Sequence, residues 1–175
     1  MKKEIYQAPT GAKAQGAVKP KYDKIEEKLL NKLLRLPVLA PPMGNYLPIN
    51  KSGKTYFLSG QLPLKDGSLG SFKGRLGKEI SLENGRAAAL QCTLNALAYL
   101  KQDLGSLEKV KRVVKLTGFV SGMPGFSQQP EVLNGASDLL VDLYGENGKH
   151  ARSAVGVTDL PFGACVEIEY IFEVK

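Results

Sequence analysis

Two charged residues near the C-terminus have the types and spacing to carry chemistry. Arg152 follows the connection "ENGKHA" and begins a stretch of small residues, "SAVGV". A guanidinium fixed at such a place can hold a carboxylate through two parallel hydrogen bonds, which a lysine does less well. A solvent-exposed or ion-paired arginine is the alternative interpretation.

Glu167 lies in the middle of the last predicted strand, where apolar residues alternate from Ala164 to Val174. The alternation puts Glu167 on the face away from the apolar side chains. If that face packs against another subunit, burial would raise the pKa of Glu167, which could then hold or deprotonate a water near neutral pH. If the face is open, Glu167, Glu169 and Glu173 form an ordinary charged stripe.

The two residues are predicted to lie in one hairpin. Pairing Thr158 with Ala164 puts Val155 opposite Glu167 and places Arg152 about 10 Å along the ladder. Such a gap suits a small substrate better than a direct salt bridge.

The elements that must position these residues can be predicted along the chain. Residues 1–22 lack periodicity and indicate an extended leader, and residues 23–36 form a docking helix between Asp23 and Pro37. Residues 37–175 then form one α+β domain. The protein is expected to be cytoplasmic. The alternative is that the leader targets it to an organelle.

Within that domain the order is β-hairpin, helix, strand, helix, hairpin. The turn "KSGK" predicts the first hairpin, and long helices are expected from Ser81 to about Asp103 and from Pro130 to Gly145, around a strand over 108–120. Two helices would cover one face of the sheet. The other face would expose apolar residues beside charged groups, namely Val113, Phe119, Cys165 and Ile171. Because an apolar sheet face left in water is costly, we expect the protein to self-associate through this face.

Composition limits the function classes. The 175 residues, 43% of them hydrophobic, suit a single domain, and no window approaches the ~18 apolar residues of a membrane span. Cys92 and Cys165 are expected to be buried free thiols. His150 is the only histidine, which disfavours metal and Ser-His-Asp chemistry, and it is expected at the surface.

Charge and glycine patterns are less informative about function. The formal net charge is +7, but the first 28 residues supply seven lysines against four acids. The basic run "KVKRVVK" (109–115) indicates a strand with a solvated edge, not a nucleic-acid surface. The glycine-rich stretch 65–78 lacks a phosphate-loop motif and is expected to be a surface loop, which could gate a neighbouring cleft.

Several motifs, in order, resemble the Rid family of reactive-intermediate deaminases, the YjgF-type proteins also labelled L-PSP endoribonucleases. They are "GNYLP", "YFLSGQLP", "GRAAALQCTLNALAYLK", "VKRVVKLTGFV", "VLNGASDLLVDLYG" and, most specifically, "ARSAVGVTDLPFGACVEIEYI". The resemblance covers residues 44–174. It implies a chorismate-mutase-like fold, a homotrimer with sites between subunits, and no cofactor.

The resemblance also implies roles for particular residues. Arg152 would bind the substrate carboxylate, and Glu167 would position or activate the hydrolytic water. Pocket positions of the family correspond to Tyr46, Ser59, Gly60, Asn134 and Ala154. Ala154 replaces a cysteine common among the deaminases, so only a backbone contact is expected there.

Three functions follow as hypotheses. The first is metal-free hydrolytic deamination of 2-aminoacrylate-like enamines or imines to 2-oxo acids and ammonia, in which positioning and electrostatics supply most of the rate. The second is non-catalytic binding of small carboxylates. The third, endoribonuclease activity, lacks a paired general acid and base in this sequence.

Overall fold

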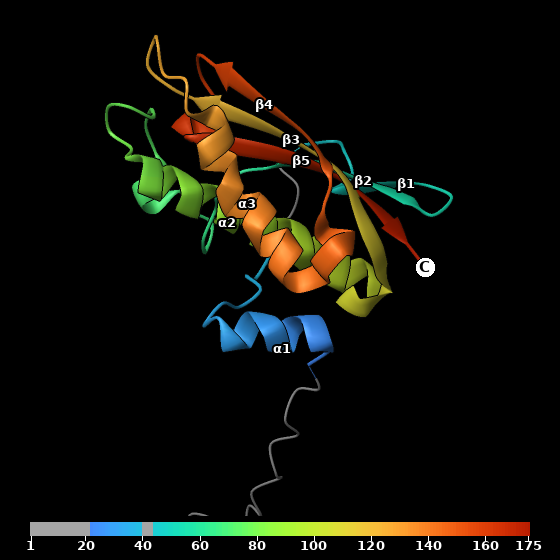
Figure 1. Ribbon diagram of the computed structural model, residues 1–175. Helices are drawn as coiled ribbons and strands as arrows, with labels where there is room; N and C mark the ends of the chain where they lie inside the picture. The colour runs from blue at the N-terminus through green and yellow to red at the C-terminus, as the bar shows by residue number, and fades with distance from the viewer. Residues whose placement is uncertain (1–21, 40–43) are drawn as a thin grey trace, which may run out of the picture.

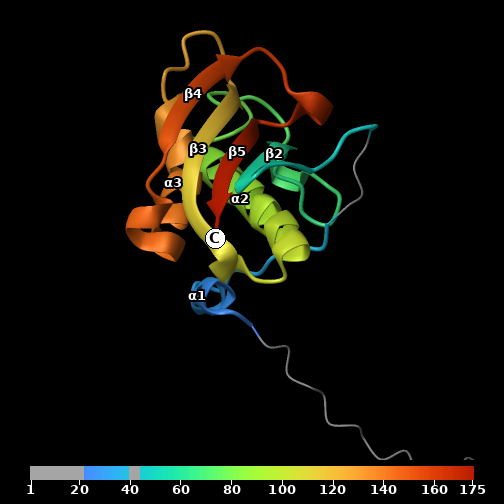
Figure 2. The same ribbon diagram turned by 90° about the vertical axis from the view of Figure 1, so that its right-hand side faces the viewer.

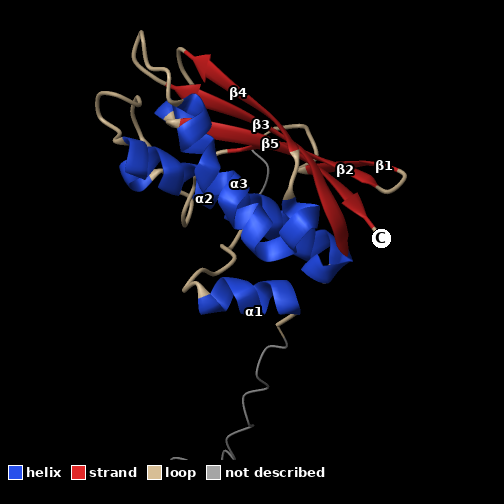
Figure 3. Cartoon of the chain, in the orientation of Figure 1, coloured by secondary structure: helices blue, strands red, loops and turns tan. Residues whose placement is uncertain are grey.

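The computed structural model describes residues 22–39 and 44–175, so the predicted leader lies almost wholly outside the described residues. Three α-helices and five strands in these residues form a two-layer α+β fold, with the helices on one side of a single sheet (Figures 1 and 3). The elements are α1 (Lys24–Asn31), β1 (Ile49–Ser52), β2 (Thr55–Gln61), α2 (Leu82–Leu104), β3 (Val110–Ser121), α3 (Gln129–Tyr144), β4 (Ala151–Val157) and β5 (Val166–Val174).

The strand order β1-β2-β5-β3-β4 follows from two crossover connections. α3 connects β3 to β4, and these two strands are adjacent and parallel. α2 connects β2 to β3, and a gap of one strand separates these two. β5 fills that gap and is antiparallel to both neighbours. Both crossovers move toward the β4 edge of the sheet, so right-handed connections place both helices on the same face, as Figure 2 shows. The expected arrangement of two long helices on one face is therefore confirmed.

The two long helices have the boundaries that their end residues favour. The Ser81 hydroxyl accepts a hydrogen bond from the Asn84 N–H at the start of α2, and Gly105 takes a left-handed conformation at its end. α3 carries Pro130 in its first turn and ends before Gly145. Both predicted helices are thus confirmed within a residue or two.

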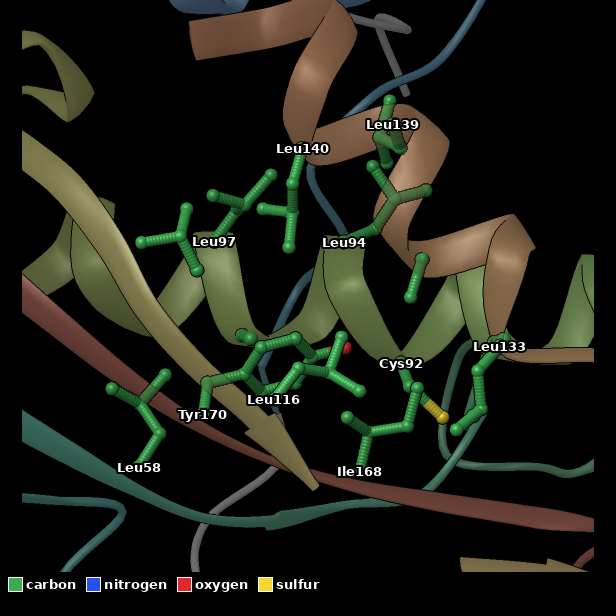
Figure 4. Close-up of a cluster of buried hydrophobic side chains, with 14 of the residues drawn as sticks. Leu58, Cys92, Leu94, Leu97, Leu116, Leu133, Leu139, Leu140, Ile168 and Tyr170 are labelled. Carbon is green, nitrogen blue, oxygen red and sulfur yellow. The ribbon is translucent and has the colours of Figure 1, made fainter. Parts of the chain in front are cut away.

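The core lies between these helices and the sheet. One face of β5 buries Val166, Ile168, Tyr170 and Phe172. They meet apolar side chains of α2, α3 and β3, among them Leu97, Leu116, Leu133 and Leu140 (Figure 4). Cys92 and Cys165 are buried free thiols, as predicted.

α1 begins where the sequence predicts but is shorter than the predicted helix 23–36. Asp23 caps it through the backbone N–H groups of Ile25 and Glu26. The helix ends at Asn31, and Leu33 has a φ of 59°, outside the helical region. α1 still docks on the domain, because Ile25 and Leu29 are buried and the Lys28 Nζ donates to the Leu143 carbonyl at 2.6 Å.

The predicted C-terminal hairpin is wrong. β4 does not pair with β5; it pairs in parallel with β3, and β5 pairs with the other side of β3. The short connection 158–165 passes over the end of β3 instead of closing a hairpin. Val155 is therefore not opposite Glu167; both pair with Phe119 from its two sides.

The sheet face away from the helices is only partly the predicted one. Phe57 and Val155 are exposed there, at 44% and 39%, and Phe119 and Ile171 are half-buried. Val113 and Cys165, expected on this face, are buried in the core. The register shifts along β3 near Val113 explain its change of face.

Candidate functional site

One cavity of about 220 Å³ brings together four of the predicted site residues: Tyr46, Ser59, Gly60 and Glu167 all line it. Tyr46 comes from the segment before β1, Ser59 and Gly60 from β2, and Glu167 from β5. β2 and β5 are neighbours in the sheet, which explains why residues more than 100 positions apart meet.

A β-bulge shapes this cavity. Leu58 pairs with Tyr170 and Gln61 with Ile168, so β2 has one residue more than β5 between these pairs. Bulges of this kind bend a strand and redirect side chains beside functional sites. A Cβ atom built at Gly60 would collide with the Glu167 Oε1, so the carboxylate occupies the space that a side chain at position 60 would fill.

Ser59 holds the segment that carries Tyr46. Its hydroxyl donates to the Leu47 carbonyl at 2.8 Å, and its backbone N–H donates to the Pro48 carbonyl at 3.0 Å. These two bonds fix the chain next to Tyr46, whose side chain is exposed and lines the cavity. Ser59 therefore has a structural role in the cavity beside any contact with a ligand.

In the part of the chain that the structure describes, Glu167 is one of two carboxylates that line the cavity, the other being Asp66. Burial raises the pKa of the Glu167 carboxyl, and the neighbouring Glu169 raises it further. Glu169 itself is exposed on the same face of β5. A half-buried carboxyl with a raised pKa in a cavity is suited to accept a proton from a bound water nearer to neutral pH than an ordinary glutamate.

Residues that the sequence analysis did not single out complete the walls. Asn95 and Tyr99 come from α2, Phe162 from the loop before β5, and Leu62 and Leu64 from the segment after β2. The Asn95 side-chain amide donates to the carbonyls of Leu62 and Leu64, which fixes that segment. The available signal was a pair of polar positions, 95 and 99, four apart within the apolar pattern of α2.

Phe162 is placed by an unusual backbone conformation. Its φ is 58°, in the left-handed region that non-glycine residues seldom adopt, and its side chain is 60% exposed beside the cavity. Such conformations persist where the surrounding structure holds them, and they concentrate near binding sites.

Arg152 lies elsewhere. It pairs with Leu116, which faces the helices, whereas Glu167 pairs with Phe119, three residues along β3 and on the opposite face. The Arg152 Nη1 donates to the Asn134 Oδ1 at 2.8 Å and to the Ser137 Oγ at 3.0 Å, both on α3. Ala154, two residues further along β4, packs half-buried against the core on the same side.

The predicted site residues thus form two groups in one chain. Tyr46, Ser59, Gly60 and Glu167 share a cavity, and Arg152, Asn134 and Ala154 lie together at the other end of the sheet order. The predicted separation of Arg152 and Glu167 along a single ladder is wrong, because β3 lies between their strands and the two side chains point to opposite faces.

Neither a metal cluster nor a spanning helix occurs in the described ranges. No three His, Cys, Asp or Glu side chains there are grouped to hold a metal ion. Across residues 22–39 and 44–175, no helix has the length and apolar character needed to cross a membrane.

Comparison with known proteins identifies the family. The family model described as "YjgF/chorismate mutase-like, putative endoribonuclease" matches residues 26–174. The chain is 45% identical over 143 residues to Protein TCP17 of Trypanosoma cruzi, covering 81% of this chain and 89% of that protein. The chain therefore belongs to the YjgF/chorismate mutase-like family, the Rid family to which its motifs pointed.

Solved structures share the whole fold. A protein of unknown function from Agrobacterium tumefaciens matches with a TM-score of 0.81 and 43% identity, over 86% of this chain and 92% of that one. A structure from Shewanella oneidensis, named as a putative endoribonuclease, matches with a TM-score of 0.83 and 34% identity, over 87% of this chain and 100% of that one. The chorismate-mutase-like α+β fold is confirmed by these matches.

Proposed function

We propose that the protein is a homotrimeric hydrolase that deaminates 2-aminoacrylate-like enamines and imines to 2-oxo acids and ammonia. The observation that carries the proposal is the half-buried Glu167 carboxyl, with its raised pKa, in a cavity beside Gly60. The resemblance of the sequence motifs to the Rid deaminases is the second support for this reaction class.

In the proposed complex, Arg152 of one copy meets Glu167 of another. Within a single chain the two lie on opposite faces of the sheet, so one copy cannot bring both to one small substrate. Phe57 and Val155 are exposed apolar residues on the open sheet face, and packing of another copy against this face would remove them from water. A closed ring of three copies would repeat the same Arg152–Glu167 cleft at each interface.

The proposed reaction is a hydrolysis that needs no redox step. Arg152 holds the substrate carboxylate, and Glu167 accepts a proton from a water whose oxygen adds to the imine carbon. Glu167 returns this proton to the nitrogen, which gives a carbinolamine. The carbinolamine hydroxyl proton then passes to the same nitrogen as the C=O bond forms and the C–N bond breaks, so ammonia leaves with the 2-oxo acid. An enamine substrate first tautomerises to the imine. Fixed geometry and a preformed charge environment supply the rate gain.

The test is an ammonia-release assay on the full-length protein with freshly generated iminopyruvate. The wild-type protein should accelerate ammonia release above the spontaneous rate, and Arg152→Ala should lose most of that acceleration. Full activity in Arg152→Ala would overturn the proposal. Thermal stabilisation by 2-oxo acids without ammonia release would instead support a carboxylate-binding protein.

A further inference from the structure

Arg152 uses only one of its nitrogen atoms for the contacts that hold it. Both hydrogen bonds, to the Asn134 Oδ1 and to the Ser137 Oγ, come from Nη1. Among the described residues, no hydrogen bond engages Nε or Nη2. The guanidinium is therefore tethered at one corner, and its Nε–Nη2 edge has the two parallel N–H groups that a carboxylate can accept.

A second contact stands behind this tether. The Ser137 Oγ lies 3.1 Å from the Nε2 of His150, and the Nδ1 of the same ring lies 2.7 Å from the Gly148 carbonyl oxygen. A carbonyl only accepts hydrogen bonds, so Nδ1 carries the ring proton. In the neutral ring Nε2 is then an acceptor, and the Ser137 hydroxyl donates a hydrogen bond to it.

The direction of these hydrogen bonds leaves the Ser137 oxygen available to accept from Arg152. Because the Ser137 hydroxyl donates to His150, the lone pairs of Oγ are left to accept the N–H of Arg152. Asn134 and Ser137 lie three residues apart on α3 and so present their acceptors on one side of the helix. Arg152, Ser137 and His150 thus form a single directed chain of hydrogen bonds that ends at the Gly148 carbonyl, and Asn134 accepts a separate bond from Arg152.

The end of this chain is fixed by close packing. Gly148 is buried, and a Cβ atom there would collide with the backbone carbonyl of Leu140 on α3. The absence of a side chain lets the 145–148 turn lie directly on α3, with the Gly148 carbonyl oxygen 2.7 Å from the imidazole Nδ1. Burial lowers the pKa of His150 by more than the hydrogen bond to Gly148 raises it, and the charge of Arg152 lowers it further, so the neutral ring is favoured.

We propose that Ser137 and His150 are positioning residues, which orient Arg152 so that its Nε–Nη2 edge faces the substrate carboxylate. This inference rests on the proposed function, in which Arg152 binds that carboxylate. It assigns a role to the histidine that the sequence analysis expected at the surface and that the structure shows to be half-buried.

The binding test uses calorimetry of 2-oxobutanoate with full-length protein and its variants. Ser137→Ala removes the oxygen that accepts from Arg152, and His150→Leu removes the acceptor that orients this oxygen. Each change should weaken binding by about 5- to 10-fold. His150→Gln should recover affinity to within about 3-fold of wild type, because its side-chain oxygen can replace Nε2 as the acceptor. This rescue would not occur if the histidine served only to fill space.

Coupling to Arg152 separates positioning from general damage. In an Arg152→Ala background, Ser137→Ala should cause no further loss of affinity, because the group it orients is absent. An equal loss in both backgrounds would overturn the inference. Should His150→Leu fail to fold, Ser137→Ala and His150→Gln still decide the question.

The single histidine also allows a direct spectroscopic test. In protein labelled with ¹⁵N-histidine and carrying no tag, only His150 contributes an imidazole signal. The neutral ring should carry its proton on Nδ1, and Ser137→Ala should change the Nε2 shift. A proton found on Nε2 in the wild-type protein would overturn the proposed direction of the chain.

Different affinities would separate a failure of the proposed function from a failure of the positioning role. Unchanged 2-oxobutanoate affinity in Arg152→Ala would remove the proposed function itself. Weakened affinity in Arg152→Ala, together with wild-type affinity in Ser137→Ala and His150→Leu, would keep the function and reject the positioning role.

Discussion

Replacing Glu167 by glutamine tests the proposed base most simply, because Glu169 provides a control on the same strand and face. Glu167 is half-buried in the cavity, whereas Glu169 is exposed two residues away. Glu167→Gln keeps the shape of the side chain and removes its ability to take a proton. Glu169→Gln removes the same charge outside the cavity.

A positioned general base contributes about 10²- to 10⁴-fold to a rate, which corresponds to about 3–5 kcal/mol of barrier. We therefore expect kcat for ammonia release to fall by that factor in Glu167→Gln, with the affinity for 2-oxobutanoate little changed. In Glu169→Gln, kcat should stay within about 3-fold of wild type, because the exposed charge acts on the site mainly through solvent.

The pH dependence gives the same test a second readout. Burial raises the pKa of Glu167 above that of an ordinary glutamate, so kcat/KM should rise with pH through an acid limb above about 4.3. Because Glu169 raises this pKa further, Glu169→Gln should move the limb to lower pH. Equal rates in Glu167→Gln and Glu169→Gln would refute the role assigned to Glu167.

Three further predictions concern the supports of the site and of the fold. Gly60→Ala should lower kcat by about 100-fold, because its Cβ would displace the Glu167 carboxylate; unaltered kcat in a steady-state assay would contradict this placement. Asp23→Ala should lower the free energy of unfolding by about 2–4 kcal/mol in urea titrations. Asp23 caps α1, and it also accepts hydrogen bonds from the Leu107 N–H at 2.7 Å and from the Ser106 hydroxyl at 2.9 Å. Replacing the exposed Glu27 by alanine should lower this free energy by far less. Burial alone would raise the pKa of Asp23, but its hydrogen bonds outweigh burial and lower the pKa in the folded protein. The contribution of Asp23 to the free energy of unfolding should therefore be present above about pH 3.9 and be lost as pH falls through the lower folded pKa. A loss of stability in acid that is the same in Asp23→Ala as in the wild-type protein would be inconsistent with this. Arg152→Ala should raise the pKa of His150 in an NMR titration, because the positive charge of Arg152 lowers it; an unchanged pKa would argue against the electrostatic effect of Arg152 on the ring.

Much of the fold was accessible from local patterns in the sequence. The alternation of β5, the stripe of α3 and the caps at Ser81, Gly105 and Gly145 each depend on residues close together in the chain. Side-chain periodicity reports which face of an element is buried, and it did so correctly for Glu167. It does not report which strand is the neighbour.

That gap explains the error at Arg152. The short connection 158–165 between two strands favours a hairpin, but the crossover through α3 pairs β4 with one side of β3, and β5 pairs with the other side. The prediction for His150 failed for a related reason. Its burial comes from the packing of Gly148 on the α3 backbone, a long-range contact with no local signature.

The most direct test of the central claim is complementation between two inactive variants. If Arg152 of one copy and Glu167 of another form each site, trimers reassembled from an equal mixture of Arg152→Ala and Glu167→Gln chains should contain intact sites. In random assembly, a site has an intact Arg152 half of the time and an intact Glu167 half of the time, so about one site in four is intact. The mixed trimers should therefore release ammonia at about a quarter of the wild-type rate. Activity no higher than that of the separate variants, in trimers shown to be mixed, would contradict it.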